Sequence, residues 1–167
     1  AHNWPFLNPP AKLSNKVEEK LSGLEWLGDL KKYLPSTEVK TCADVTYEGK
    51  PFILQFNRAH TGSGTMLIDS KEALEKIQET FPKREARISA FIEGPMFTSN
   101  NVVTDDAVLT GNISYQITGL PPFTDAPFAT IGNDWSLPHR LLSKEQNEAY
   151  NKIVQDIGSK NRSPLFD

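Results

Sequence analysis

Apolar residues recur at helical spacing in three segments of the chain. The first follows a proline-rich, aromatic stretch (1–13) that we expect to form an extended arm. Ser14 is the expected N-cap of this helical segment. Gly23 and Gly28 are expected to divide this segment into two short helices, and Pro35 is expected to end it. The apolar stripe that defines the segment consists of Val17, Leu21, Leu24, Leu27 and Leu30.

The other two helical segments carry clear start signals. One is expected from Ser70 to Thr80, with a proline just beyond its end. The last is expected to begin after Ser143, whose spacing to Gln146 fits a capping box. Gly158 is expected to occupy the C′ position that ends this last helix.

Short apolar runs bounded by glycine, proline and asparagine predict strands between the helices. Several of these runs are joined by short turns, and they outnumber the helices, which favours an α+β fold with largely antiparallel sheet. Segment 119–139 is rich in proline, glycine and aspartate, and we expect it to be a long loop. The strands are expected at 38–41, 51–56, 65–69, 86–92, 96–104 and 107–118.

Composition excludes several classes of function. The 167 residues carry a net charge of −3 and scattered basic residues, which argues against a nucleic-acid-binding protein. No apolar run approaches the roughly 20 residues needed to cross a membrane. Cys42 is the single cysteine, so no intrachain disulfide can form, and a reducing cytoplasmic location is expected. Asp105 and Asp106 are adjacent, which is typical of a turn rather than of paired acids at a site.

The segment with the most chemical information is a strand–loop–strand unit at 51–69. Its loop, 57–64, places Thr61, Gly62, Ser63 and Gly64 between two apolar strands. Glycine lets the backbone approach a polyanion closely, so such a loop can close over phosphates as a flap. A plain hairpin that binds nothing is the alternative reading, because the composition of the loop is common. The loop lacks the Gly-Lys-Ser/Thr that defines a phosphate-binding P-loop.

The order of motifs along the chain resembles the ATP-grasp superfamily. The sequence carries Asn15-Lys16 in the first helical segment, then the flap unit, then Phe91-Ile-Glu-Gly94, and later Gly132-Asn-Asp134. The resemblance covers roughly residues 13–167. It implies an ATP-grasp fold of two small α+β lobes with largely antiparallel sheets and a glycine-rich flap hairpin. We expect the small lobe at 14–94 and the start of a large lobe at 95–167.

The resemblance also implies a set of ATP-binding residues. Lys16 matches the lysine that follows the first linker in the family, and Gln55 stands where a second lysine would end the strand before the flap. Without that charge Gln55 can only form a neutral hydrogen bond to phosphate. The flap itself would cover the phosphates with Arg58, His60, Gly62, Ser63 and Gly64.

A hinge beside the adenine is implied by the Phe-Ile-Glu-Gly motif. Phe91 and Ile92 would line the adenine slot, and Glu93 would offer a further contact. The positions of the two hinge acids hold Ser89 and Met96, which departs from the family pattern.

Two readings of function remain open within this resemblance. In the first, the chain is the ATP-binding part of a ligase that uses ATP and Mg²⁺ to activate a small carboxylate as an acyl phosphate for attack by an amine. Asp167 would then be the first metal ligand, and the Glu-x-Asn motif of the family would follow it. In the second, the chain is a non-catalytic nucleotide- or protein-binding module, which the residues at positions 55, 89 and 96 favour. An unrelated α+β domain is a third reading, and the sequence leaves homo-oligomerisation open.

Overall fold

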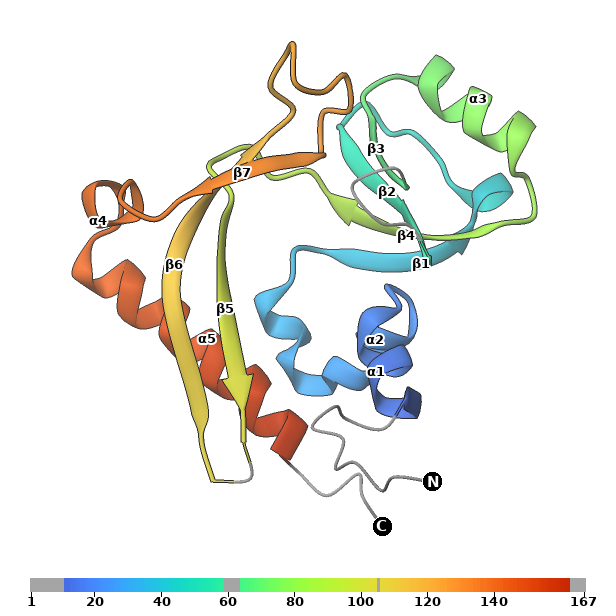
Figure 1. The fold of residues 1–167 in the computed structure, drawn as a ribbon. Helices are drawn as coiled ribbons and strands as arrows, with labels where there is room; N and C mark the ends of the chain where they lie inside the picture. Colours follow the sequence, from blue (N-terminus) through green and yellow to red (C-terminus); the bar gives the residue numbers. More distant parts are fainter. Residues whose placement is uncertain (1–10, 59–63, 105, 163–167) are drawn as a thin grey trace, which may run out of the picture.

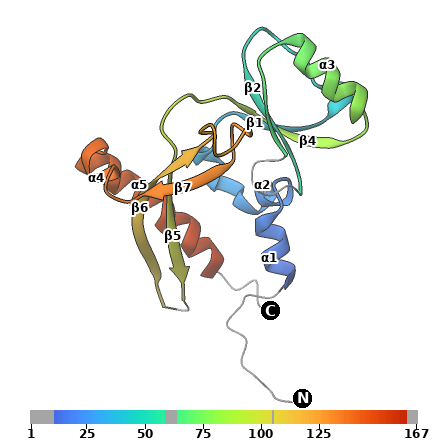
Figure 2. The same ribbon diagram turned by 45° about the horizontal axis from the view of Figure 1, so that its top comes forward.

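The chain folds into two antiparallel sheets that are joined by a short linker and bordered by helices (Figures 1 and 2). The computed structural model describes residues 11–58, 64–104 and 106–162, with the backbone alone for 161 and 162. In that part of the chain, no helix is both long enough and apolar enough to cross a membrane. The observed fold class is α+β with largely antiparallel sheets, as predicted.

The first sheet, here called sheet A, has the strand order β1-β4-β2-β3. Neighbouring strands pair antiparallel, and β4 lies between β1 and β2 although it follows both of them in the chain. Helix α3 (Lys71–Thr80) and the short 3-10 helix η2 (Cys42–Asp44) cover one face of this sheet. The strands are β1 (Thr37–Thr41), β2 (Phe52–Phe56), β3 (Thr65–Ile68) and β4 (Glu85–Ala90).

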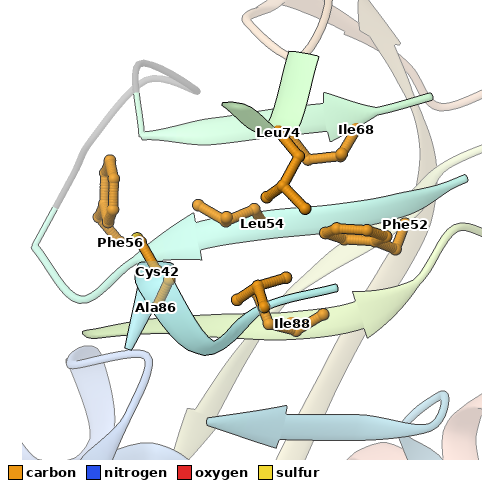
Figure 3. Packing of buried hydrophobic residues seen from close by; sticks show 9 residues of the cluster. Cys42, Phe52, Leu54, Phe56, Ile68, Leu74, Ala86 and Ile88 are labelled. Atoms are coloured by element: carbon orange, nitrogen blue, oxygen red, sulfur yellow. The ribbon is translucent and has the colours of Figure 1, made fainter. Parts of the chain in front are cut away.

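A single hydrophobic cluster holds α3 and η2 on sheet A (Figure 3). Strand β2 alternates buried and half-buried residues, because successive side chains of a strand point to opposite faces. Leu54 is fully buried at the centre, and Leu74 of α3 packs toward it. The other buried members are Cys42, Val45, Phe52, Phe56, Ile68, Ala86 and Ile88.

The second sheet, sheet B, has the order β5-β6-β7 and packs against the last helix, α5 (Lys144–Arg162). Its strands are β5 (Phe97–Val103), β6 (Val108–Thr118) and β7 (Thr130–Asp134). A one-turn helix, α4 (Pro138–Leu141), connects β7 to α5. The Gln155 side chain of α5 donates to the Val108 carbonyl of β6 at 3.0 Å.

The N-terminal helices contact both halves of the molecule. They are α1 (Ala11–Glu18), α2 (Ser22–Leu27) and the 3-10 helix η1 (Gly28–Tyr33). Toward sheet A, the Leu21 amide donates to Asn57 Oδ1 at 3.0 Å. Toward sheet B, the Tyr33 hydroxyl donates to Asp156 of α5, and the Lys160 ammonium lies 5.9 Å from the Trp26 ring centroid. These contacts place α1 and α2 beside β1 (Figure 1).

The structure corrects three predictions about the elements. Ser14 lies inside α1, which already begins at Ala11, so Ser14 is not an N-cap and residues 11–13 are helical. Segment 119–139 contains β7, whose pairing with β6 the local composition did not reveal. Gly158 lies within α5, where it faces Val108, so it is a packing position and not a C′ residue. The capping box at Ser143 and Gln146 is confirmed, because each side chain bonds the other residue's amide.

Candidate functional site

Sheet A presents a second face, opposite the core cluster, that mixes polar and apolar side chains with one arginine, Arg87, and one carboxylate, the exposed Glu85. Directly paired residues of antiparallel strands share a face. Gln55 pairs with Arg87 on β4 and with Thr65 on β3, and Ser89 pairs with Ile53 and with Thr37. The second face is therefore formed by Thr37, Val39, Thr41, Ile53, Gln55, Thr65, Leu67, Glu85, Arg87 and Ser89.

A hydrogen-bonded row crosses three strands of this second face. Arg87 donates from Nη2 to Gln55 Oε1, and Gln55 donates from Nε2 to Thr65 Oγ1 at 3.0 Å. The two bonds fix the orientation of the Gln55 amide, because its oxygen accepts from Arg87 on β4 and its nitrogen donates to Thr65 on β3. Burial lowers the pKa of the half-buried Arg87 guanidinium below its usual value. Arginine nevertheless stays charged at any physiological pH.

The base of the predicted flap is fastened to the turn between α1 and α2. Arg58 donates from Nε to Glu19 Oε1 at 3.0 Å, and its Nη2 lies 2.5 Å from the same oxygen. The bond from Arg58 lowers the pKa of the Glu19 carboxyl, and a bond from Ser22 at 3.2 Å acts in the same direction. Asn57 accepts from the Leu21 amide beside them. These bonds fix where the chain leaves β2 to enter the loop.

The linker between the two sheets follows directly from the second face. Strand β4 ends at Ala90, two residues earlier than predicted, and its last amide donates to the Ser36 carbonyl at 3.0 Å. The next residues are exposed: Phe91 at 36% and Ile92 at 70% of their surface. Because the two side chains are adjacent in the sequence, the linker has apolar surface that a ligand or another part of the protein could cover.

A cleft of about 630 Å³ opens beside this region, between α2, η1 and β1. The residues that fasten the flap, Glu19 and Asn57, border it together with Thr37 and Val39 of the second face. A smaller cavity of about 220 Å³ lies between the α1–α2 turn and Arg87, and Trp26 also lines it. The second face of sheet A is thus reachable from both sides of α2.

The structure brings some of the predicted site residues together and separates others. Gln55 and Ser89 share the second face, and Phe91, Ile92 and Glu93 follow Ser89 along the chain. Lys16 is exposed on α1, and the Ser22 hydroxyl donates to its carbonyl at 3.0 Å. Arg58 is 74% exposed in its side chain and is paired with Glu19.

The remaining predicted residues belong to the flap and the C-terminus. Gly64 is buried, and its carbonyl accepts from the Phe56 amide at 3.0 Å, which closes the stem of the hairpin. His60, Gly62 and Ser63 lie outside the described residues, as does Asp167, the predicted metal ligand. Among the described residues, no three His, Cys, Asp or Glu side chains are grouped closely enough to hold a metal ion.

Arg87 was not among the site residues predicted from the sequence. Basic residues along the chain are scattered and lie near acids, so their pattern predicts solvated surface charge. The only available signal was its position in an apolar strand, two residues before Ser89. The pairing of β4 with β2 is what places Arg87 against Gln55.

No protein-family model matches the sequence, and no curated protein matches it significantly. Several solved structures share its fold. A D-alanine–D-alanine ligase from Bacillus anthracis matches with a TM-score of 0.61 at 16% identity, over 87% of this chain and 49% of that chain. An L-amino acid ligase from Bacillus licheniformis matches with a TM-score of 0.63 at 20% identity, over 95% of this chain and 36% of that chain.

A third match is an N5-carboxyaminoimidazole synthetase from Staphylococcus aureus complexed with ADP, with a TM-score of 0.56 at 16% identity. It covers 84% of this chain and 38% of that chain. These three solved structures are ligases and a synthetase. The chain has the ATP-grasp fold, as the resemblance in the sequence predicted. It spans between about a third and half of the length of these three proteins.

Proposed function

We propose that this chain is the ATP-binding part of an ATP-grasp ligase that activates a carboxylate as an acyl phosphate for attack by an amine. In this proposal residues 14–94 form the small lobe and residues 95–167 begin the large lobe. The likeness to amino-acid ligases and to a synthetase complexed with ADP supports this class of reaction.

The observation that carries the proposal is the polar row on the second face of sheet A. A site for a nucleotide needs hydrogen-bond donors for phosphate and apolar surface for the base. Arg87 and Gln55 supply donors on this face, and the exposed Phe91 and Ile92 supply apolar surface at the adjoining linker. The hairpin of β2 and β3 carries the glycine-containing loop at the end of the same face. Phosphates would lie under that loop, with the adenine at the linker.

The chemistry of such a ligase asks for positioning and charge neutralisation rather than for a covalent intermediate on the protein. A carboxylate oxygen of the substrate attacks the γ-phosphorus of ATP, and ADP leaves. The amine then attacks the carbonyl carbon of the acyl phosphate, a proton leaves the nitrogen, and phosphate departs. In this chain, donors from sheet A and the flap would hold the phosphates, and Lys16 on α1 would add positive charge. The segment 119–139 would border the acceptor.

Magnesium would neutralise the phosphate charge, and Asp167 is the residue proposed to bind it. This part of the proposal rests on the family pattern alone, because Asp167 is outside the described residues. The cytoplasmic location and the small carboxylate substrate are likewise proposals.

A non-catalytic nucleotide-binding module is the second candidate, and one observation favours it. Gln55 and Ser89 place an amide and a hydroxyl on the second face at positions where the resemblance implies a lysine and an acid. Such a module would bind ATP or ADP without releasing phosphate.

Titration calorimetry with ATP and ADP, on this chain and on one extended beyond Asp167, tests the proposal. We expect weak binding by the chain and tighter, Mg²⁺-dependent binding by the extended form. Release of phosphate with a carboxylate and an amine present would separate the ligase from the non-catalytic module. Two folded proteins that bind neither nucleotide would contradict both candidates.

A further inference from the structure

Arg87 is a half-buried cation without a countercharge in the described part of the chain. Burial is the sole cause of its lowered pKa, and no described carboxylate forms a salt bridge with it. Its Nε is buried and has no hydrogen-bond partner among the described residues. Burying a charge without a partner costs free energy, and proteins seldom retain such a group unless a ligand supplies the partner.

The other arginines near sheet A are balanced differently. Arg58 is exposed and paired with Glu19, as described above. Arg84 stacks on the Phe56 ring at 3.8 Å, on the side of the core cluster. Arg87 instead faces Gln55 and lines the small cavity beneath the α1–α2 turn. Gln55, its bonded partner, is neutral and can orient a guanidinium but cannot neutralise it. Glu18 and Glu19 line the same cavity and Glu85 lies on the same face, but none of them forms a salt bridge with Arg87.

The row across β3, β2 and β4 holds Arg87 in place for an anion. Because Thr65 takes the amide nitrogen of Gln55, the amide oxygen is turned toward Arg87. A guanidinium has five N–H donors in a planar fork that matches phosphate and carboxylate. The described contacts use one of the five, so donors remain for an anion.

We propose that Arg87 binds a phosphate group of the nucleotide and that Gln55 is its positioning residue. The inference rests on the proposed function, which places a nucleotide on this face. It also accounts for the glutamine at position 55: a lysine there would set two cations side by side, whereas an amide oxygen accepts from the arginine. The cation of this site then comes from β4 rather than from β2.

Calorimetry with ATP, ADP and adenosine on the wild type, Arg87→Met and Arg87→Lys tests this inference. Charge-assisted hydrogen bonds contribute enough that Arg87→Met should weaken ADP binding by about 10- to 100-fold. Arg87→Lys should recover part of the loss, and adenosine, which has no phosphate, should bind all three proteins alike. Arg84→Met is the matched control, since Arg84 lies on the core side, and it should leave ADP affinity unchanged.

A paired swap separates a phosphate contact from a structural role. Gln55→Lys combined with Arg87→Met moves the cation from β4 to β2 and should restore ADP affinity to within about threefold of the wild type. Thermal unfolding without ligand supplies a second measurement. Removing an unpaired half-buried charge should leave the melting temperature of Arg87→Met unchanged or raise it, whereas a structural arginine would lower it.

The outcomes distinguish the two proposals. If the wild type binds ATP and ADP and Arg87→Met binds ADP equally well, the inference about Arg87 is wrong while the nucleotide site stands. An equal loss of adenosine binding would also overturn it, because the arginine would then act on the fold or on the base. If the folded wild type binds none of the three ligands, the proposed function fails and the inference fails with it.

Discussion

Glu19, in the turn between α1 and α2, binds Arg58 at the base of the loop 57–64. Its carboxylate accepts two bonds from Arg58 and one from Ser22, while the neighbouring Leu21 amide binds Asn57. Arg58 was predicted to contact ATP directly. In the structure its charge is already balanced, so it would have to leave Glu19 before it could bind a phosphate.

Replacement of Glu19 by glutamine should destabilise the protein at neutral pH and not at acid pH. The folded-state pKa of Glu19 lies below its usual 4.5, so the stabilisation by the carboxylate is present above that usual value. It is lost as the pH falls through the lowered pKa. The melting temperatures of the wild type and Glu19→Gln, measured across this range, should therefore differ at pH 7 and converge on acidification.

Glu48→Gln is the control, because Glu48 is an exposed loop residue. It should follow the wild type at every pH. If the melting temperatures of Glu19→Gln and the wild type still differ in acid, Glu19 stabilises the fold by something other than its ion pair with Arg58.

At the scale of elements, several features that depend only on nearby residues, such as the starts of α3 and α5 and the strand at 51–56, were predicted correctly. The Ser70 hydroxyl accepts from the Ala73 amide at 3.3 Å, as expected of an N-cap, and the strand 51–56 has the period-two burial of a half-buried strand. The capping box of α5 is likewise a local feature that was predicted. These features depend on residues at most three or four positions away in the sequence, so they can be predicted from it.

Features that depend on distant partners were not predictable. Strand β7 contains Gly132, Asn133 and Asp134, which are rare in strands, and it forms because β6 offers a partner. The role of Gly158 depends on Val108, and that of Arg87 depends on Gln55. The sequence therefore singled out Gln55 and Ser89, which share a face in the structure, but it did not single out Arg87, which pairs with Gln55 across the sheet.

Gly158→Ala tests the packing of α5 on β6. Alanine favours helix by about 1 kcal/mol over glycine, but a Cβ at this position would lie 2.5 Å from Val108 Cγ1. Valine is stiff about χ1 and cannot turn away easily. We expect a net loss of about 1–2 kcal/mol, because overpacking a close contact outweighs the gain in propensity.

Chemical denaturation measures this loss, with Ser159→Ala as the exposed neighbour that should be neutral or slightly stabilising. Adding Val108→Ala to Gly158→Ala should relieve the clash and make the two changes non-additive. A Gly158→Ala protein as stable as the wild type would show that α5 is not packed as described.

The strand–loop–strand unit should consist of a rigid stem and a mobile tip. Strands β2 and β3 pair from Phe52 to Gln55, and Phe56 closes the stem on Gly64. Hydrogen exchange of the free protein should be fast in the 59–63 tip and slow at 52–54. Gly62→Ala should leave stability unchanged and weaken ADP binding, because a methyl group hinders close approach of the backbone to phosphate. Equal protection of tip and stem would mean a packed hairpin rather than a flap.

At the scale of the whole molecule, the N-terminal helices and strand β1 border a common cleft, and the linker leaves sheet A at the end of β4. Sheet B continues from the linker, and α5 returns to contact Tyr33 and Trp26 beside that space. A nucleotide at the second face would touch residues from β2, β4 and the linker, and would leave α3 and its core untouched. The residues that a bound nucleotide contacts therefore test its placement on this face, just as the affinity tests whether it binds.

The most direct measurement is a titration of the isotope-labelled protein with ADP, followed by the amide chemical shifts of each residue. We expect the amide shifts to change along the second face and the linker, at Gln55, Arg87, Ser89 and 91–93, while that of Leu74 in α3 stays unchanged. Shifts confined to sheet B or to α3, or no change in a folded protein at millimolar ADP, would contradict the placement of a nucleotide on this face of the ATP-grasp fold.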